Sequence, residues 1–126
     1  MYSHMMVGSN DIDRSKKFYD ATFKAIGGRE GIVDPKGRLV YAHNGGVFLV
    51  TKPIDGEPAT HGNGCTIGFA MTPEQADAWH AAGVENGGTA IEDPPGIREG
   101  SGMKMYLAYL RDPDGNKLCA LHRVTD

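Results

Sequence analysis

Residues 4–23 read HMMVGSNDIDRSKKFYDATF, and they predict a short strand that leads directly into a helix. The polar residues at positions 9–11 are favourable helix-capping residues. Beyond them, residues that suit a buried face recur at steps of three and four, which indicates one apolar side of a helix. The members of this face are Ile12, Ser15, Phe18, Tyr19, Thr22, Phe23 and Ile26. Gly27 and Gly28 are typical of a helix end.

Three strands are expected between this helix and the middle of the chain. They are predicted over residues 31–34, 38–43 and 47–51. The Pro-Lys-Gly turn at 35–37 separates the first two, and Asn-Gly-Gly at 44–46 is a strong hairpin signal between the last two. The first half of the chain is therefore predicted to run strand, helix, strand, strand, strand.

The second half repeats this order after a polar loop at residues 53–64. A strand is expected over 65–71, and a helix should begin at Thr72 with Pro73 at its first position and Gln75 completing a capping box. Three strands then follow, at 89–92, 103–111 and 117–123, with residues 93–102 predicted as a loop.

A repeat of about 60 residues decides the predicted architecture. We expect an α+β fold in which residues 1–126 form one domain of two βαβββ modules, at about 1–52 and 65–126. One helix cannot cover both faces of a module's sheet, so the other face must meet the second module, solvent or a ligand.

Composition and charge indicate which classes of binding partner can be excluded. Lysine and arginine number 13 against 16 acidic residues, a net charge of −3, which argues against a nucleic-acid partner. No apolar run approaches the roughly 20 residues of a membrane helix, so no membrane partner is expected. The two cysteines and the absence of a secretory signal in residues 1–8 predict a reduced, cytoplasmic protein.

The paired modules and residues 109–122, YLRDPDGNKLCALH, resemble the vicinal oxygen chelate superfamily, which includes glyoxalase I, bleomycin-resistance proteins and extradiol dioxygenases. The resemblance covers nearly the whole chain. It rests also on residues 4–23 and on the strand and helix that follow Gly64. It implies that the modules pair into a curved, cup-like mixed sheet that is open to a ligand.

By this resemblance, metal-using members take ligands from the first and last strand of each module. His4 fits the first of the four positions, and Thr66 and Cys119 occupy two others. The fourth falls near Leu49 or Thr51. Because only His4 matches a usual ligand position, no metal cofactor is expected. A divalent zinc, nickel, manganese or iron ion is the less favoured alternative.

The hairpin around Asp112–Gly115 predicts which residues point into the cup. With a turn of four residues, Arg111 would lie opposite Asn116 and Tyr106 opposite Leu121, which places Tyr106 on the same face as Cys119. Tyr106 would then donate to a ligand or wall the pocket. Cys119 would be a reactive thiol or, more simply, a small buried residue.

Strand alternation makes the complementary prediction for the residues beneath the helices. Cys65, Ile67 and Phe69 should face the helix, and Tyr109 and Leu118 should pack there too. The residues between them point the other way, and the resemblance to the family then implies that Thr66 lies on the same concave surface as His4. His4 is then a ligand donor or general base, or a histidine hydrogen-bonded at a strand start.

Two further candidates lie in predicted loops at the mouth of the cup. His61 belongs to the glycine-rich midpoint, and Arg98 to the Pro-Pro-Gly loop, where a guanidinium would suit a carboxylate or phosphate. The alternative for both residues is that they are ordinary polar side chains of a solvent-exposed loop, with no role in binding.

Three functions follow from the sequence and its resemblance. The first is a glyoxalase/bleomycin-resistance-type protein that binds a small polar or aromatic molecule in a cup without the usual metal. The alternatives are a metal-dependent lyase, isomerase or dioxygenase, and a protein-interaction module. A homodimer is expected, because short modules leave sheet edges that need covering. The modules could pair within one chain or across the dimer.

Overall fold

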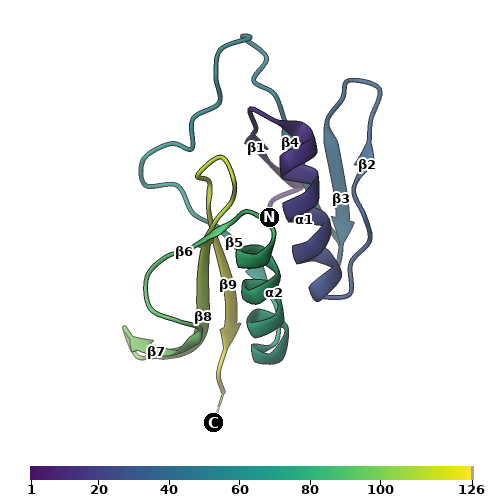
Figure 1. Ribbon diagram of the computed structural model, residues 1–126. Helices are drawn as coiled ribbons and strands as arrows, with labels where there is room; N and C mark the ends of the chain where they lie inside the picture. The colour runs from purple at the N-terminus through teal and green to yellow at the C-terminus, as the bar shows by residue number, and fades with distance from the viewer. Residues whose placement is uncertain (126) are drawn as a thin grey trace.

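The computed structural model describes residues 1–125 and contains the two predicted modules (Figure 1). The first consists of β1 (His4–Gly8), α1 (Ile12–Ala25), β2 (Ile32–Val33), β3 (Leu39–His43) and β4 (Gly46–Thr51). The second consists of β5 (Ile67–Ala70), α2 (Pro73–Glu85), β6 (Thr89–Ala90), β7 (Gly96–Gly100), β8 (Met103–Arg111) and β9 (Lys117–Arg123). The α+β class predicted from the repeat is confirmed.

Each module has one mixed sheet, and the two sheets share a topology. The first has the order β1-β4-β3-β2, and the second has the order β5-β9-β8-β6. In both, the first strand runs parallel to the last strand of its module, and the remaining neighbours are antiparallel. The helix between the first two strands of each module allows this parallel return.

The loop predicted at residues 93–102 is wrong, because Gly96–Gly100 forms β7 along β8. Strand β9 pairs with one edge of β8, and both β6 and β7 pair with the other edge. They contact different parts of β8, with β6 at residues 110–111 and β7 at residues 103–107. They therefore act as one strand interrupted around Pro94 and Pro95. Proline and glycine hide this strand in the sequence, since both are poor strand formers and only the partner strand supplies the ladder.

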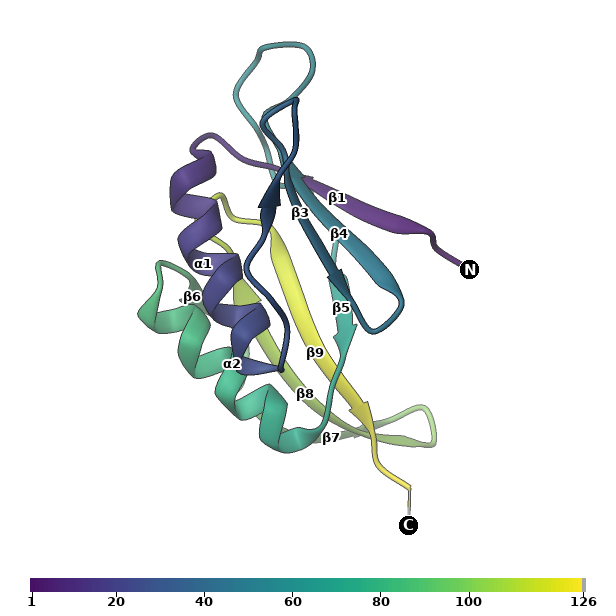
Figure 2. The same ribbon diagram turned by 90° about the vertical axis from the view of Figure 1, so that its right-hand side faces the viewer.

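Both helices lie on the same side of the sheets and pack against each other (Figure 2). Asp11 caps α1 by accepting a hydrogen bond from the N–H of Arg14. Thr72 and Gln75 form the predicted capping box at the start of α2. No helix within residues 1–125 is long and apolar enough to cross a membrane.

The core lies between the helices and the sheets. Phe18 and Tyr19 of α1 are almost fully buried, and their rings meet edge to face with centroids 4.8 Å apart. Leu110 and Leu118 occupy the same layer in the second module. Val7, Ile67 and Phe69 also pack toward the core, as the strand alternation predicts. The remaining buried apolar residues include Phe23, Leu39, Tyr41, Phe48, Val50 and Trp79.

The loop between β8 and β9 joins the second module to the first. Asp114 accepts hydrogen bonds from the backbone N–H of Asn10 and from the side chains of Arg14 and Ser15. The amide of Asn116 donates to the carbonyl oxygen of Gly8 at 3.1 Å. The Asp-Pro-Asp-Gly-Asn motif therefore clasps the junction of β1 and α1 as well as making a turn.

Candidate functional site

The register of the β8–β9 hairpin differs by one residue from the prediction. Arg111 pairs with Lys117, Tyr109 with Cys119, and Tyr106 with His122. Because side chains alternate between the two faces of a sheet, a one-residue change in register changes which residues of β8 share a face with a given residue of β9.

Gly115 is the physical reason for the different register. The N–H of Gly115 donates to the carbonyl of Asp112, and the N–H of Asp112 donates to the carbonyl of Asn116, both at 2.9 Å. Gly115 has a φ of 91°, which is the left-handed conformation of a bulge residue after a type I turn. The connection therefore uses one residue more than the predicted four-residue turn.

The prediction that Tyr106 and Cys119 share a face is consequently wrong. The hydroxyl of Tyr106 donates to Oδ1 of Asp77 on α2 at 2.6 Å, so Tyr106 lies on the helix side. Tyr109, which was expected beneath the helices, lies directly opposite Cys119 on the other side. Leu118 packs beneath the helices as predicted. We call the side of the second sheet that carries Tyr109 and Cys119 the open face.

A small group of polar side chains surrounds Tyr109 on the open face. The Lys117 ammonium lies 5.0 Å from the centroid of the Tyr109 ring and 2.5 Å from Oε2 of Glu92. An ammonium over an aromatic face is attracted by the ring quadrupole. Glu92 has a φ of 60°, which is uncommon for a residue with a side chain. The bend after β6 thus holds a carboxylate close to Lys117.

Cys119 is buried, and its burial raises the pKa of the thiol, with a hydrogen bond from Tyr109 opposing the shift. Burial also raises the pKa of Tyr109, and the neighbouring Cys119 adds to the effect. Both groups are therefore neutral near pH 7. A thiol is a weak nucleophile and metal ligand in its protonated form, so the pair is better suited to hydrogen bonding than to attack.

A cavity of about 550 Å³ opens between β1 and the segment that leads into β5. Two of the predicted site residues, His61 and Thr66, line this cavity together with Lys117. Because Lys117 also touches Tyr109 and Glu92, it connects the cavity to the open-face group. We call this combined region the open-face site.

Cys65 also lines the cavity, and the prediction that it packs beneath a helix is wrong. Gly62 and Gly64 both have left-handed φ values, of 71° and 94°. They extend the loop, so β5 begins only at Ile67 and the Cys65 thiol is exposed.

Two predicted residues lie apart from this cavity. His4 is exposed at the start of β1, where its Nδ1 is hydrogen-bonded to Oγ of Ser3 at 2.8 Å. Arg98 lies on β7 instead of in a loop. Its guanidinium donates to the backbone carbonyls of Asp93, Gly96 and Leu107, at 2.7, 3.1 and 2.7 Å. Arg98 thereby ties the interrupted edge strand to β8.

Of the six predicted residues, the structure thus brings His61 and Thr66 into one cavity, and it turns Tyr106 to the opposite side of the sheet. Within residues 1–125, no three His, Cys, Asp or Glu side chains come close enough to hold a metal ion. Sequence reasoning missed Tyr109, Lys117 and Glu92. The asparagine after Asp-Pro-Asp-Gly could have indicated Tyr109 and Lys117. The carbonyl of Asn116 accepts a hydrogen bond from the N–H of Asp112, so Asn116 belongs to the connection and lengthens it by one residue.

Comparison with known proteins places this geometry in a family. The sequence profile of the Glyoxalase/Bleomycin resistance protein/Dioxygenase superfamily matches residues 2–120. The chain belongs to this superfamily. The comparison with curated proteins found no match.

Solved structures agree with the assignment to the superfamily. A glyoxalase/bleomycin resistance protein from Albidiferax ferrireducens T118 is 59% identical, with a TM-score of 0.93 over 98% of this chain and 99% of that chain. A family enzyme from Burkholderia phytofirmans PsJN is 20% identical, with a TM-score of 0.73 over 97% and 98%. A glyoxalase/bleomycin resistance protein/dioxygenase from Alicyclobacillus acidocaldarius is 18% identical, with a TM-score of 0.68 over 98% and 91%. The last two share the fold alone.

Proposed function

We propose that this superfamily member binds a small polar or aromatic molecule at the open-face site, without a bound metal. The observation that carries the proposal is the position of Lys117, between the 550 Å³ cavity and the ring of Tyr109. A concave site with a few convergent polar groups on an otherwise apolar lining suits a small ligand.

The available donors define the class of ligand. Lys117 supplies an ammonium, Thr66 and Tyr109 supply hydroxyls, and His61 supplies an imidazole. These groups favour a ligand with a carboxylate or hydroxyl group. Glu92 is about half exposed and balances Lys117, so a ligand carboxylate would take the place that the Glu92 carboxylate holds.

Binding without a metal is supported by the donor set. His4 is the one side chain that matches a usual ligand position of the family, and it lies outside the cavity that His61 and Thr66 line. The free thiols Cys65 and Cys119 suit a reducing compartment, and we place the protein in the cytoplasm.

4-Hydroxybenzoate is a suitable probe, because it carries a carboxylate and a hydroxyl on one ring. In an NMR titration of metal-free protein, we expect the shifted amides to cluster around Thr66, Tyr109 and Lys117. Lys117→Met should weaken binding roughly tenfold, the value of one charge-assisted hydrogen bond.

The matched control is Lys17→Met, because Lys17 is an exposed lysine on α1. It should leave the affinity unchanged. Equal affinities for the two variants, or binding only after a divalent metal is added, would contradict the proposal. The second outcome would favour the metal-dependent enzyme.

A further inference from the structure

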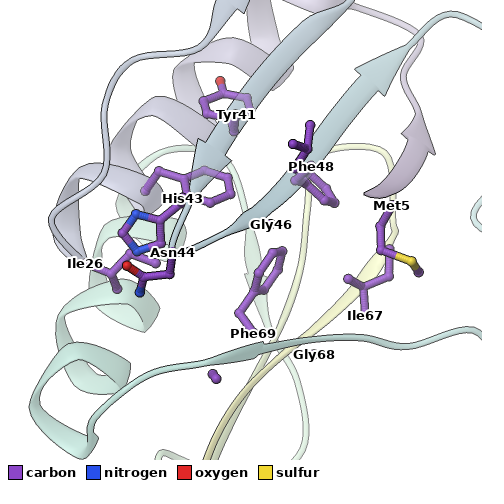
Figure 3. Close-up of a pocket in the computed structure, with 13 residues that line it drawn as sticks. Met5, Ile26, Tyr41, His43, Asn44, Gly46, Phe48, Ile67, Gly68 and Phe69 are labelled. Carbon is purple, nitrogen blue, oxygen red and sulfur yellow. The ribbon is translucent and has the colours of Figure 1, made fainter. Parts of the chain in front are cut away.

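A second cavity, of about 250 Å³, lies on the helix-facing side of the strands where the two modules meet (Figure 3). Met5 of β1 and Ile67 of β5 line both this cavity and the cavity of the open-face site. The two side chains lie next to each other in Figure 3 and form the partition between the cavities. We call the second space the intermodule cavity.

Aromatic rings from three elements form the walls of the intermodule cavity. Phe69 of β5 meets Phe48 of β4 and Phe23 of α1 edge to face, with ring centroids 5.4 and 5.8 Å apart. The ring of Tyr41 stacks on Phe23 at 4.6 Å. Figure 3 shows Phe48 and Phe69 pointing toward each other from opposite sheets. Because each ring is held by the next, the walls are already arranged for a flat apolar group.

Polar atoms gather at one end of the intermodule cavity. His43, at the end of β3, and Asn44, in the turn to β4, lie together there (Figure 3). The Tyr41 hydroxyl is already engaged, because it donates to Oδ1 of Asp20 at 2.7 Å. Among the described lining residues there is no lysine, arginine or carboxylate. The lining therefore offers hydrogen bonds at one end and no permanently charged side chain to pair with an ion.

We propose that the intermodule cavity binds a neutral aromatic molecule of one or two rings that carries a single hydroxyl or ring N–H. The ring packs against Phe48 and Phe69, which already contact each other, and the polar group points to His43 and Asn44. An apolar cavity of roughly 150 Å³ holds benzene, so a cavity of about 250 Å³ has room for a substituted ring. Edge and face contacts with aromatic neighbours add to the burial of such a ring.

Trp79 is placed to report on this occupant. It is the single tryptophan of the chain and is 2% exposed. A small gap directly behind the cavity wall is lined by Trp79 together with Phe23, Ile26 and Phe69, all three of which also line the cavity. A heavy atom bound in the cavity therefore lies close to the indole of Trp79.

The test uses 4-bromophenol, whose bromine quenches tryptophan fluorescence. We expect quenching of Trp79 that saturates with concentration. Met5→Phe places a larger side chain in the cavity and should weaken the effect at least tenfold. Met6→Phe is the matched control, because Met6 is the adjacent half-exposed methionine and lines the open-face cavity but not the intermodule cavity. It should leave the quenching unchanged.

A second variant tests the proposal even if Met5→Phe fails to fold. Asn44→Gly removes the amide and suits the positive φ of 47° at this position. It should weaken binding of 4-bromophenol several-fold while leaving bromobenzene unaffected. Quenching that rises linearly without saturation, or that is equal in Met5→Phe and Met6→Phe, would overturn the proposal.

The intermodule cavity is independent of the open-face site. Lys117→Met should leave the quenching by 4-bromophenol unchanged, because Lys117 does not line this cavity. Loss of one binding event without the other therefore distinguishes failure of this proposal from failure of the open-face proposal.

Discussion

The hydroxyl of Tyr19 donates a hydrogen bond to Oδ2 of Asp112 at 2.5 Å, and both residues are buried. Tyr19 belongs to α1 and Asp112 to the loop after β8, so the bond joins the two modules. Asp112 also accepts from the Asn116 side chain and from the backbone N–H groups of Asp114 and Asn116. Its oxygens are thus fully occupied inside the protein, which makes this loop the main polar link between the modules.

Tyr19→Phe should lower the free energy of unfolding by about 1–3 kcal/mol, because it removes a donor from a buried carboxyl group. Urea denaturation measures the loss. The matched control is Tyr41→Phe, whose hydroxyl donates to Asp20. Asp20 is partly exposed and keeps its bond to Lys16, so this loss should be smaller. Equal losses for the two variants would show that burial of Asp112 does not govern the effect.

Gly115→Ala should destabilise the protein by roughly 1–2 kcal/mol, since a side chain is disfavoured at its φ of 91°. Gly37→Ala is the control, with a φ of 78° and open space around an added Cβ. The added Cβ at Gly115 would also lie 2.7 Å from the His61 ring. The NMR signals of His61 should therefore shift in Gly115→Ala and stay in place in Gly37→Ala. Unchanged His61 signals in both variants would contradict this contact.

Acid should reveal the contribution of Asp20. Burial alone would raise its pKa, but hydrogen bonds from the Gly31 N–H, Lys16 and Tyr41 outweigh it and hold the pKa below its ordinary value of 3.8. The stability from this group is present above pH 3.8 and is lost as the pH falls through the lowered pKa. The difference in unfolding free energy between the native protein and Asp20→Asn should therefore shrink from pH 7 to pH 3. A constant difference in urea denaturation would disprove the assignment.

The purified protein should hold no stoichiometric zinc, nickel, manganese or iron. His4 alone is too few ligands for a stable site. Elemental analysis of protein prepared without chelators measures the metal content directly. About one metal ion per chain, lost in His4→Ala, would reverse this expectation and favour an enzyme that uses the metal.

The protein should be a homodimer in solution. Apolar side chains such as Met6, Ile32 and Leu121 are exposed on the sheets, and short edge strands favour pairing with another chain. Light scattering at micromolar concentration should give about twice the chain mass of 13.5 kDa. A mass of one chain across the concentration range would refute the dimer.

The order of elements could be predicted from sequence because local interactions determine it. The apolar face of α1 depends on residues three and four apart, and the start of α2 depends on the contact between Thr72 and Gln75. The resemblance carried by residues 4–23 and 109–122 led to the superfamily that the profile match supports. These features need no knowledge of distant parts of the chain.

Which tyrosine faces the open side was decided only by the tertiary structure. Side chains alternate along a strand, so the extra residue in the connection at Gly115 changes which residues share a face with Cys119. Tyr109 therefore lies on the open face, and Tyr106 lies on the helix side. Strand β7 likewise exists because β8 supplies its hydrogen-bond ladder. Lys117 and Glu92, and the rings of Phe48 and Phe69, come from separate strands or bends. Contacts between segments so far apart depend on how the sheets pack, and no local sequence pattern specifies that packing.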